Sequence, residues 1–567
     1  MSDWGAVNDR IESLRAGMDL EMPGYIGDGE KQIIDAVREG RLPIQELDNC
    51  ARRMLLLVAR CSSADRRQKA ELRQEHRDVA ERAACEGIVL LKNDGGLLPL
   101  NRKGTIALIG EFAKKPRYQG AGSSLVTPLA VENAYDAIVS RAGDELEILF
   151  APGYREDSLK PDKALLAEAK KAATKADMVI IFCGLPAILE TEGIDRRDLR
   201  MPESHECLVE EVLSVNRNAV LVLMNGGPLE MPWAGAVPCI LEAYLGGQSG
   251  GNAIARILFG EENPSGKLAE TFPVRWKDNP ASRFFPGGRE SVEYREGTLV
   301  GYRYYDAAGC DVLFPFGHGL SYTEFSYEGL SLKEENSDGH ISIDVSFTIR
   351  NTGKRQGKEG AQVYVKKTGS SSKNHQRGLA AFAKIALAPG ESKPVSLSVD
   401  ELELSCWNTK EGRWIAAGGT YEIQVGSSSR DIRLKGMIDI RGFPKCEVGE
   451  ENSPDYFGAL AEGDKGKKAF EAIIGSELPS GNKVQRGRYT LDTPLCDMEG
   501  FLAALLRFLL RSAAMIAMAG NRHNPTVAAI GKILMEAPLR KFTFFTNGAV
   551  KNPFLEGLLA LLNFRLF

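Results

Sequence analysis

The chain has 567 residues, of which 43% are hydrophobic and 26% are charged, and its net charge at pH 7 is −5. This length predicts several domains at roughly 150 residues each, and the composition excludes a disordered or fibrous protein. The slight acidic excess gives no electrostatic reason to expect a nucleic-acid partner. The ten cysteines form no CxxC pair and no Cys/His cluster. This pattern argues against a zinc site and favours a reducing compartment, so a cytoplasmic location is expected.

Residues 1–65 are expected to form a helix, a short strand and two further helices. VNDRIESLRAG has apolar residues at helical spacing and stops at Gly17, a suitable residue after a helix end. MDLEMPG is the expected strand. The region has too few strands to close a sheet, so it is typical of the end of a β/α repeat. A charged helical connector, SADRRQKAELRQEHRDVAERAACEGIVLL, is expected over about 66–90.

Up to residue 275, apolar runs alternate with amphipathic helical segments. The runs are TIALIG, LEILFAPG, DMVIIFCG, AVLVLMNGG and CILEAYLGG. Strands that alternate with helices predict a mostly parallel sheet that is covered on both faces. Ligands of such sheets bind at the carboxyl ends of the strands, so the glycine-rich loops after these runs are the candidate site.

The rest of the chain changes period twice. Residues 276–325 are irregular and are interpreted as a linker. Residues 326–441 alternate with a period of two between turn signals, which predicts a β-sandwich. Residues 442–567 are expected to form a helical extension. Its apolar stretch Phe501–Gly520 carries Arg507 and Arg511 on one helical face. Because arginine is expensive inside lipid, an amphipathic helix is favoured over a membrane segment.

One charged loop follows the run DMVIIFCG directly. Its sequence is ETEGIDRRDLR, and it contains several ionisable side chains: Glu190, Glu192, Asp195, Arg196, Arg197 and Asp198. The loop alone favours an ordinary solvated connection to the next helix. Its interpretation changes when it is taken together with other segments.

Seven segments occur in a fixed order: SDWGAVNDR with AGMDLEMPG, EGIVLLKNDGGLLPL, PRYQGAGSS, ETEGIDRRDLRMP, GGQSGGNAIARILFGEENPSGKLAETFP, EGTLVGYRYYD and FPFGHGLSYTEF. This series closely resembles glycoside hydrolase family 3, which includes many β-glucosidases. The resemblance extends from Asp3 to about residue 440, and the tail APLRKFTFFTNGAVKNPFLEGLLALLN resembles the C-terminal extension of some members. It implies a (β/α)8 barrel, an α/β sandwich domain and a fibronectin-III-like sandwich. Residues 1–65 would be the C-terminal remnant of the barrel, and residues 66–275 the α/β sandwich domain.

The resemblance also implies roles for individual residues. Asp3 in SDW corresponds to the catalytic nucleophile, and Trp4 to an aromatic that stacks on the sugar. Glu192 in EGIDR corresponds to the general acid/base. The loop PRYQGAGSS would project toward the sugar, with Arg117 and Tyr118 as contacts.

Alternative interpretations stay open for several residues. Trp4 could be a core aromatic, and Glu190 is the main rival for the acid role. Asp195 and Arg196 are interpreted as a local ion pair that holds the loop, and His318 as a structural residue.

The proposed chemistry suits two carboxyl groups. Hydrolysis of a glycosidic bond with retention needs two carboxyls about 5–5.5 Å apart. Asp3 suits the ionised nucleophile. Glu192 suits the protonated acid if burial or the nearby carboxylate raises its pKa.

The expected function is therefore that of a retaining, exo-acting β-glucosidase that hydrolyses terminal β-linked glucose, without a metal or cofactor. The substrate would be a β-glucoside or a short β-linked oligosaccharide. A β-xylosidase or α-arabinofuranosidase is the first alternative, and a non-catalytic carbohydrate-binding remnant the second. The sandwich is expected to be a packing module, although its loop TGSSSKNHQRG could approach the active site.

The start of the chain departs from the family pattern. A (β/α)8 barrel takes about 250 residues, whereas only Met1 and Ser2 precede Asp3 here. We therefore expect a truncated chain that has little activity alone. The expected partners are a second copy in a homo-oligomer, or a separate chain that supplies the barrel.

Overall fold

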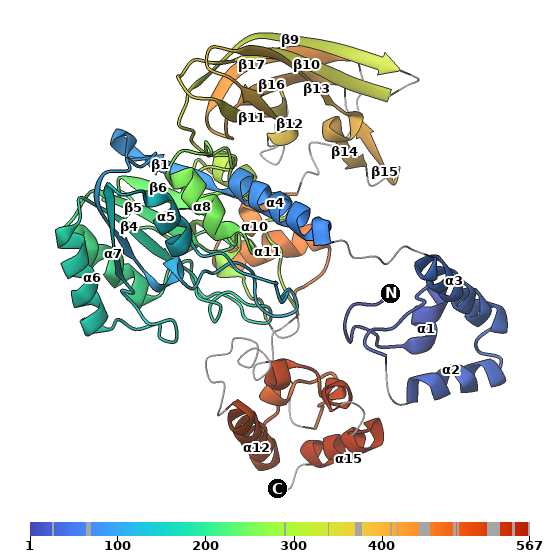
Figure 1. The fold of residues 1–567 in the computed structure, drawn as a ribbon. Helices are drawn as coiled ribbons and strands as arrows, with labels where there is room; N and C mark the ends of the chain where they lie inside the picture. The colour runs from blue at the N-terminus through green and yellow to red at the C-terminus, as the bar shows by residue number, and fades with distance from the viewer. Residues whose placement is uncertain are drawn as a thin grey trace. The chain divides into compact units, whose positions relative to one another are not determined.

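The computed structural model describes the chain except residues 25–27, 64–69, 289–290, 338–339, 369–376, 409–410, 417, 442–453, 480–483, 485–486, 519–532, 547–549 and 565–567. Most of the loop TGSSSKNHQRG lies outside the described residues. The chain divides into two units (Figure 1). The first unit comprises Met1–Arg73 and Asn482–Phe567, and the second comprises Gln74–Gly481. Each is considered by itself.

The N-terminal part of the first unit is helical, as predicted. Its helices are α1 (Arg10–Arg15), α2 (Asp28–Arg38) and α3 (Ile44–Ser62). The side chain of Asp9 caps α1 by accepting from the backbone N–H groups of Ile11 and Glu12. The helices enclose a small apolar cluster of Leu14, Ala36, Leu42 and Cys50.

The predicted strand MDLEMPG is wrong, because residues 18–24 are not assigned as a strand. They run alongside the first residues of the chain. The Ser2 N–H donates to Leu20 O and the Gly5 N–H donates to Met22 O, both at 2.8 Å. Two such bonds to a very short partner segment do not make a regular ladder, but they do hold the segment that carries Asp3.

The C-terminal part of the first unit is helical too, which confirms the expected helical extension. It contains α12 (Phe501–Met518), α14 (Phe542–Phe545) and α15 (Asn552–Asn563). Arg507 lies within α12, and its Nη1 donates to Leu495 O at 3.1 Å. This contact shows why an arginine occurs in an apolar helix. Among the described helices, none is long and apolar enough to cross a membrane.

The second unit contains the predicted α/β sandwich domain. Its sheet has the order β1-β6-β5-β4-β2-β3, and the five strands from β6 to β3 in this order are parallel to one another. The strands are β1 (Val89–Asn93), β2 (Gly104–Ile109), β3 (Leu146–Ala151), β4 (Met178–Gly184), β5 (Ala219–Met224) and β6 (Cys239–Glu242). All six residues of β5 are buried, which is the pattern of a central parallel strand.

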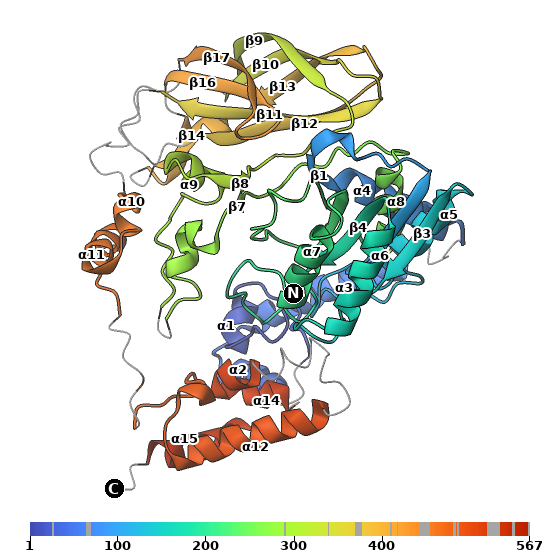
Figure 2. The same ribbon diagram turned by 90° about the vertical axis from the view of Figure 1, so that its left-hand side faces the viewer.

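Helices cover both faces of this sheet (Figures 1 and 2). Helices α5 (Ala134–Ala142) and α8 (Gly250–Leu258) pack together, and so do α6 (Lys163–Lys175) and α7 (Glu203–Leu213). One expected boundary was wrong. The connector helix α4 (Ala70–Gly87) ends before IVLL, whose residues VLL belong to the edge strand β1, and β1 is antiparallel to β6.

The predicted β-sandwich is present in the same unit. One sheet has the order β13-β10-β9 and the other has the order β12-β11-β16-β17. The strands are β9 (Phe325–Ser337), β10 (His340–Asn351), β11 (Gly357–Lys367), β12 (Gly378–Leu387), β13 (Ser392–Val399), β16 (Gly419–Gly426) and β17 (Ile432–Ile440). A side hairpin pairs β14 (Ser405–Asn408) with β15 (Arg413–Ala416).

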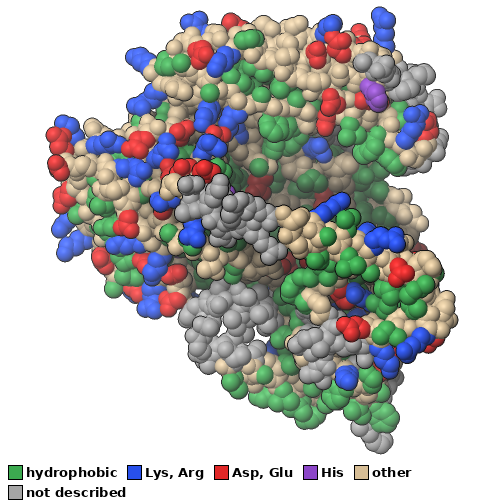
Figure 3. Space-filling model, turned by 45° about the vertical axis from the view of Figure 1, so that its right-hand side comes forward, with side chains coloured by type: hydrophobic (Ala, Val, Ile, Leu, Met, Phe, Trp, Pro, Cys, Tyr) green, Lys and Arg blue, Asp and Glu red, His purple; other side chains and the backbone are tan. Residues whose placement is uncertain are grey.

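The predicted linker contains short elements. Its strand β8 (Val312–Phe314) pairs with β7 (Phe272–Pro273), which lies before the linker at the end of the predicted α/β sandwich domain. Helix α9 spans Tyr302–Ala307. After the sandwich follow α10 (Tyr456–Ala459) and α11 (Gly463–Ile474). Short 3-10 turns are η1 (Asp94–Gly96), η2 (Glu111–Ala113), η3 (Trp276–Asp278), η4 (Pro280–Arg283), η5 (Glu401–Leu404), η7 (Leu495–Asp497) and η8 (Leu539–Lys541). On the face shown in Figure 3, basic and acidic side chains are intermixed.

Candidate active site

The five predicted site residues fall into two groups. Glu192, Arg117 and Tyr118 belong to the second unit, whereas Asp3 and Trp4 belong to the first. Arg117 and Tyr118 lie on the loop after β2, and Glu192 lies on the loop after β4. These strands are parallel neighbours, so both loops leave the same edge of the sheet.

Asp3 lies on an exposed segment. Its Oδ1 accepts from the backbone N–H of Trp4 at 2.6 Å. The hydroxyl of Ser2, the preceding residue, accepts from the Met22 N–H at 2.8 Å. Trp4 is 63% exposed, which does not fit the alternative of a core aromatic. Both side chains are therefore accessible to a ligand.

Glu192 is exposed, and a turn of the neighbouring loop holds its carboxylate. The Ser123 N–H donates to Glu192 Oε2 at 2.6 Å. Gly122 has a φ of +85°, and a Cβ there would lie 2.5 Å from the Cβ of Glu192. Only glycine allows this approach.

The pKa of Glu192 differs from the sequence-based expectation. Hydrogen bonds from Ser123 to the carboxylate lower this pKa from its ordinary value. The expected rise required burial or a nearby carboxylate, but the side chain is exposed and its described partner is a donor. In this unit, the surroundings of Glu192 therefore favour its ionised carboxylate.

Arg117 and Tyr118 do not both face solvent. Arg117 is buried, its Nε donates to Leu185 O at 2.9 Å, and its Nη1 donates to Gln119 O at 2.6 Å. These bonds tie the loop after β2 to the loop after β4, so Arg117 fits a positioning role better than a sugar contact. Tyr118 is half-buried, and its hydroxyl accepts from Gln119 Nε2 at 3.0 Å.

Glu190, the other candidate for the acid, is held by a backbone N–H group and by a positively charged side chain. Both of its carboxylate oxygens accept from the Gly226 N–H, at 2.8 and 3.0 Å. Arg117 Nη2 lies 3.3 Å from Glu190 Oε2. A carboxylate occupied in this way is a poor proton donor to a substrate, so the geometry does not favour Glu190 as the acid.

Arg196 is anchored differently from the predicted ion pair with Asp195. Its Nη1 donates to Pro228 O at 3.0 Å. The side chain is largely desolvated, which lowers its pKa, while the charges of Glu190, Asp198 and Glu270 act in the opposite direction. The predicted role in holding the loop fits this contact, although the partner is a backbone carbonyl.

Two carboxyls, Glu242 at the end of β6 and Glu270 just before β7, were not anticipated from the sequence. Glu242 is fully buried, and its carboxyl accepts from Asn225 Nδ2 and from the Tyr244 N–H, both at 3.0 Å. Burial raises the pKa of Glu242 well above its ordinary value. Glu270 is exposed, but desolvation of its carboxyl raises its pKa to about 7. In the sequence, the signal for a buried carboxyl was the glutamate that ends the apolar run CILE.

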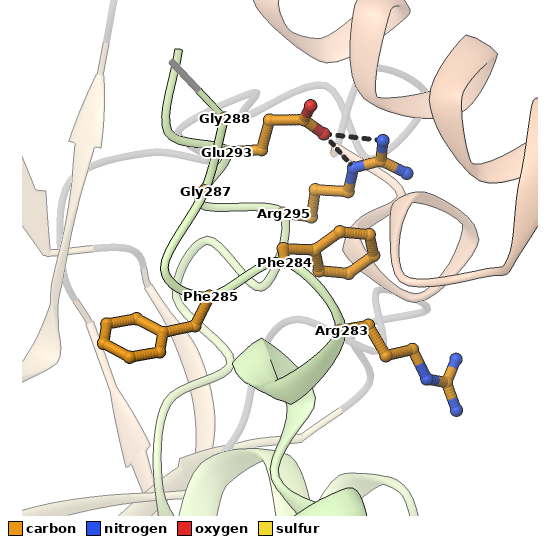
Figure 4. Close-up of a pocket in the computed structure, with 7 residues that line it drawn as sticks. All are labelled: Arg283, Phe284, Phe285, Gly287, Gly288, Glu293 and Arg295. Atoms are coloured by element: carbon orange, nitrogen blue, oxygen red, sulfur yellow. Dashed lines mark hydrogen bonds and ion pairs between the residues drawn. The ribbon is translucent and has the colours of Figure 1, made fainter. Parts of the chain in front are cut away.

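A pocket of about 260 Å³ lies in a different part of the second unit. Figure 4 shows Glu293 and Arg295 paired beside the ring of Phe284, while Phe285 points away from them. The Arg295 guanidinium lies 4.3 Å from the centre of the Phe284 ring. None of the five predicted site residues lines this pocket. Its main feature is the way in which the buried Arg295 is paired.

His318 also has structural contacts. Its ring Nε2 lies 2.9 Å from Leu91 O on β1, and its ring stacks on that of Phe314. These contacts fit the structural role expected from the sequence.

Two family models match the chain. Residues 88–322 match the glycosyl hydrolase family 3 C-terminal domain, and residues 359–429 match a fibronectin type III-like domain. The chain is 45% identical to thermostable beta-glucosidase B of Acetivibrio thermocellus over 445 residues, which are 78% of this chain and 59% of that protein. This chain belongs to glycosyl hydrolase family 3. The resemblance stated from the sequence is thereby confirmed.

Other family 3 proteins are similar over the same region. An exo-alpha-(1->6)-L-arabinopyranosidase of Bifidobacterium breve is 41% identical, over 79% of this chain and 59% of the relative. The crystal structure of a Bifidobacterium adolescentis GH3 beta-glucosidase superposes with a TM-score of 0.72 at 39% identity, covering 78% of this chain and 64% of that chain. The chain thus spans 59% of the length of these two curated relatives.

Proposed function

We propose that this family 3 chain acts in retaining, exo-type hydrolysis of terminal β-linked glucose, with Glu192 as acid/base and Asp3 as nucleophile. The observation that carries the proposal is the position of Glu192. Glu192 is solvent-accessible on the loop after β4, at the carboxyl ends of the parallel strands, and Gly122 on the neighbouring loop leaves room for it. This is the edge at which α/β sheets bind ligands. The relative named thermostable beta-glucosidase B supports glucose as the sugar.

The two roles of Glu192 need two protonation states. In a retaining mechanism, the acid/base carboxyl first protonates the leaving oxygen and later, as a carboxylate, activates water. The Ser123 N–H favours the carboxylate and lowers its pKa. A substrate that excludes water, and a second carboxylate at 5–5.5 Å, would raise that pKa toward the value an acid needs. The ionised state is therefore the resting, substrate-free form.

The substrate of the proposed reaction is a β-glucoside or a short β-linked oligosaccharide. Trp4, which is 63% exposed, would stack its ring on a sugar face, as aromatic rings do on apolar surfaces. We further propose that the chain alone turns over slowly, because Asp3 lies on an exposed segment. A catalytic carboxylate must be held within about 0.5 Å of its productive position. A separate chain that carries the barrel would supply that support.

A second candidate is the hydrolysis of a pentoside. The relative from Bifidobacterium breve, 41% identical, is named an exo-alpha-(1->6)-L-arabinopyranosidase. This observation favours an arabinoside over the xyloside that the sequence also left open. The residues of the second unit would serve both reactions in the same way.

The test is hydrolysis of aryl β-D-glucoside, β-D-xyloside and α-L-arabinopyranoside by the purified chain and its Glu192→Gln variant. Glu203→Gln, an exposed glutamate in the first turn of α7, is the control. We expect weak turnover of the glucoside, at least a hundredfold below a typical enzyme value of about 10 s⁻¹. We expect it to disappear in Glu192→Gln and to persist in Glu203→Gln. Equal activity of all three proteins would exclude Glu192, and faster turnover of the arabinoside would select the second candidate.

A further inference from the structure

The loop that carries Glu192 is fixed on both sides of this residue. The loop runs from the end of β4 to the start of α7. Glu192 itself is exposed, and its described hydrogen-bond partner is the Ser123 N–H. An exposed side chain with so few contacts cannot fix its own position. Its position must therefore depend on how the loop backbone is held.

The first attachment lies two residues before Glu192. The carboxylate of Glu190 accepts from the Gly226 N–H with both oxygens, at 2.8 and 3.0 Å. Arg117, which is buried, adds a charged donor 3.3 Å away. Hydrogen bonds of this charge-assisted kind are among the stronger ones in proteins.

The second attachment lies four residues after Glu192. Arg196 Nη1 donates to Pro228 O at 3.0 Å. The other terminal nitrogen of this guanidinium, Nη2, is buried without a hydrogen-bond partner within the described part of the chain. Because this guanidinium is desolvated, the surrounding protein atoms, and not water, fix its position.

Both attachments lie on the same turn. Gly226 and Pro228 belong to the segment that directly follows β5, the strand next to β4 in the sheet. A Cβ on Gly226 would lie 3.0 Å from Glu190 Oε1, so a larger residue here would press against the carboxylate. The sheet thus positions the turn, and the turn positions the loop.

We propose that Glu190 and Arg196 are positioning residues that clamp the Glu192 loop onto the Gly226–Pro228 turn. This inference rests on the proposed role of Glu192 and extends it. Loss of either attachment lets the loop shift, and Glu192 then leaves the Ser123 N–H. Misplacement of a reacting group by about 1 Å can cost a hundredfold in rate.

Hydrogen–deuterium exchange at the Ser123 amide tests this without any need for activity. This N–H is bonded to Glu192, and neither Glu190 nor Arg196 is among its partners in the described contacts. Glu192→Ala gives the exchange rate of the unprotected amide. In Glu190→Gln and Arg196→Lys, we expect exchange at Ser123 to be about ten-fold faster than in the unsubstituted chain, because a hydrogen bond has been lost.

Matched controls separate clamping from general loosening. Arg197→Lys changes an exposed arginine on the same loop, and Glu203→Gln an exposed glutamate on α7. Both should leave Ser123 exchange unchanged, and amides of β4 and β5 should stay protected in every variant. Unchanged Ser123 protection in both Glu190→Gln and Arg196→Lys would overturn the proposal. So would equal acceleration in Arg197→Lys.

The activity assay then distinguishes the two proposals. If the chain hydrolyses an aryl glucoside, kcat should fall at least ten-fold in Glu190→Gln and Arg196→Lys, with a smaller change in KM, because positioning acts mainly on the transition state. Turnover that does not depend on Glu192 would refute the proposed function. The exchange result would still decide whether the clamp exists.

Discussion

At the scale of single residues, His205 shows how burial links stability to pH. Its ring lies 3.9 Å from the ring of Tyr154, centre to centre, and its Nδ1 lies 3.0 Å from Gly184 O. Burial lowers the pKa of His205 to about 3. Because the folded value lies below the ordinary 6.5, the unfolded chain binds this proton first. The stabilisation by neutral His205 is therefore complete above pH 6.5 and is lost as the pH falls toward 3.

We expect His205→Gln to flatten the pH dependence of stability. In the unsubstituted chain, this residue should remove about 1.4 kcal/mol of unfolding free energy per pH unit below 6.5. The variant should lack this contribution even if it is less stable at pH 7. Thermal unfolding between pH 7 and 5 measures the effect, with His76→Gln, on the exposed side of α4, as control. Parallel curves for the unsubstituted chain and His205→Gln would contradict this expectation.

Glu270 titrates in the opposite sense. Its pKa is raised to about 7, chiefly by desolvation and also by the charge of Glu190. Its contribution to stability is full below pH 4.5 and is lost as the pH rises through 7. Glu270→Gln should therefore raise the Tm relative to the unsubstituted chain at pH 8, and change it little at pH 4.5. A Tm difference that is the same at both pH values would show that Glu270 does not titrate in this range.

The sequence identified the residues of the candidate site better than it identified their tasks. Glu192 stood out because a charged loop followed a buried strand within a recognisable series of motifs. Its low pKa could not be foreseen, since Ser123 is 69 positions away in sequence. Glu190 was considered as an acid for the same reason: its partner Gly226 is 36 positions away. The charge of a residue can be read from the sequence, whereas its hydrogen-bond partners depend on which loops the sheet brings together.

At the scale of elements, glycine at the strand ends permits close packing of neighbouring chain segments. Gly184 ends β4 with a φ of +145°, and a Cβ there would collide with the Met224 carbonyl at the end of β5. Gly110, after β2, has a φ of +117° and would collide in the same way with the Phe182 carbonyl. The loops that bear the candidate site therefore start from backbone that only glycine can adopt.

Gly184→Ala should destabilise the second unit by about 3 kcal/mol or more, because strain and a backbone collision add. Gly235→Ala is the matched control, since a Cβ there meets no atom within 4 Å. Denaturant unfolding monitored by tryptophan fluorescence gives both values. Equal midpoints for the two variants would show that the β4 end can relax without cost.

Element prediction succeeded where the apolar pattern was long and failed where it was short. DMVIIFCG and AVLVLMNGG predicted β4 and β5, which are buried along nearly their whole length. IVLL was predicted to end a helix, although Gly87 precedes it and its last three residues belong to β1. MDLEMPG has the composition of a strand, but its partner is a segment of only a few residues.

At the scale of the whole molecule, the two units have separate cores. The second unit contains the large apolar cluster around β1 to β6 and the cluster of the sandwich. The first unit contains a cluster of four buried residues at its N-terminal end and another of seven in its C-terminal part. Because hydrophobic stabilisation scales with the apolar area buried, the first unit should be the less stable.

We expect calorimetry to resolve at least two unfolding transitions. Leu42→Ala removes a residue that is 1% exposed from the small cluster of the first unit, and Leu221→Ala removes one that is 0% exposed from β5. Each should cost about 2–5 kcal/mol, the first in the lower transition only and the second in the upper transition only. A single transition that shifts in both variants would show that the chain unfolds as one cooperative body.

The segment FGHGLSY affects how readily the chain can associate with other copies. Leu320 forms a bridge with Leu90, its N–H donates to Leu90 O at 2.8 Å, and the ring of His318 reaches Leu91 O. The segment therefore covers the outer side of β1, while the opposite edge strand β3 carries the exposed charge of Glu147. An uncovered apolar strand edge recruits other chains. Cleavage or displacement of residues 317–321 should therefore expose the edge of β1 and favour aggregation.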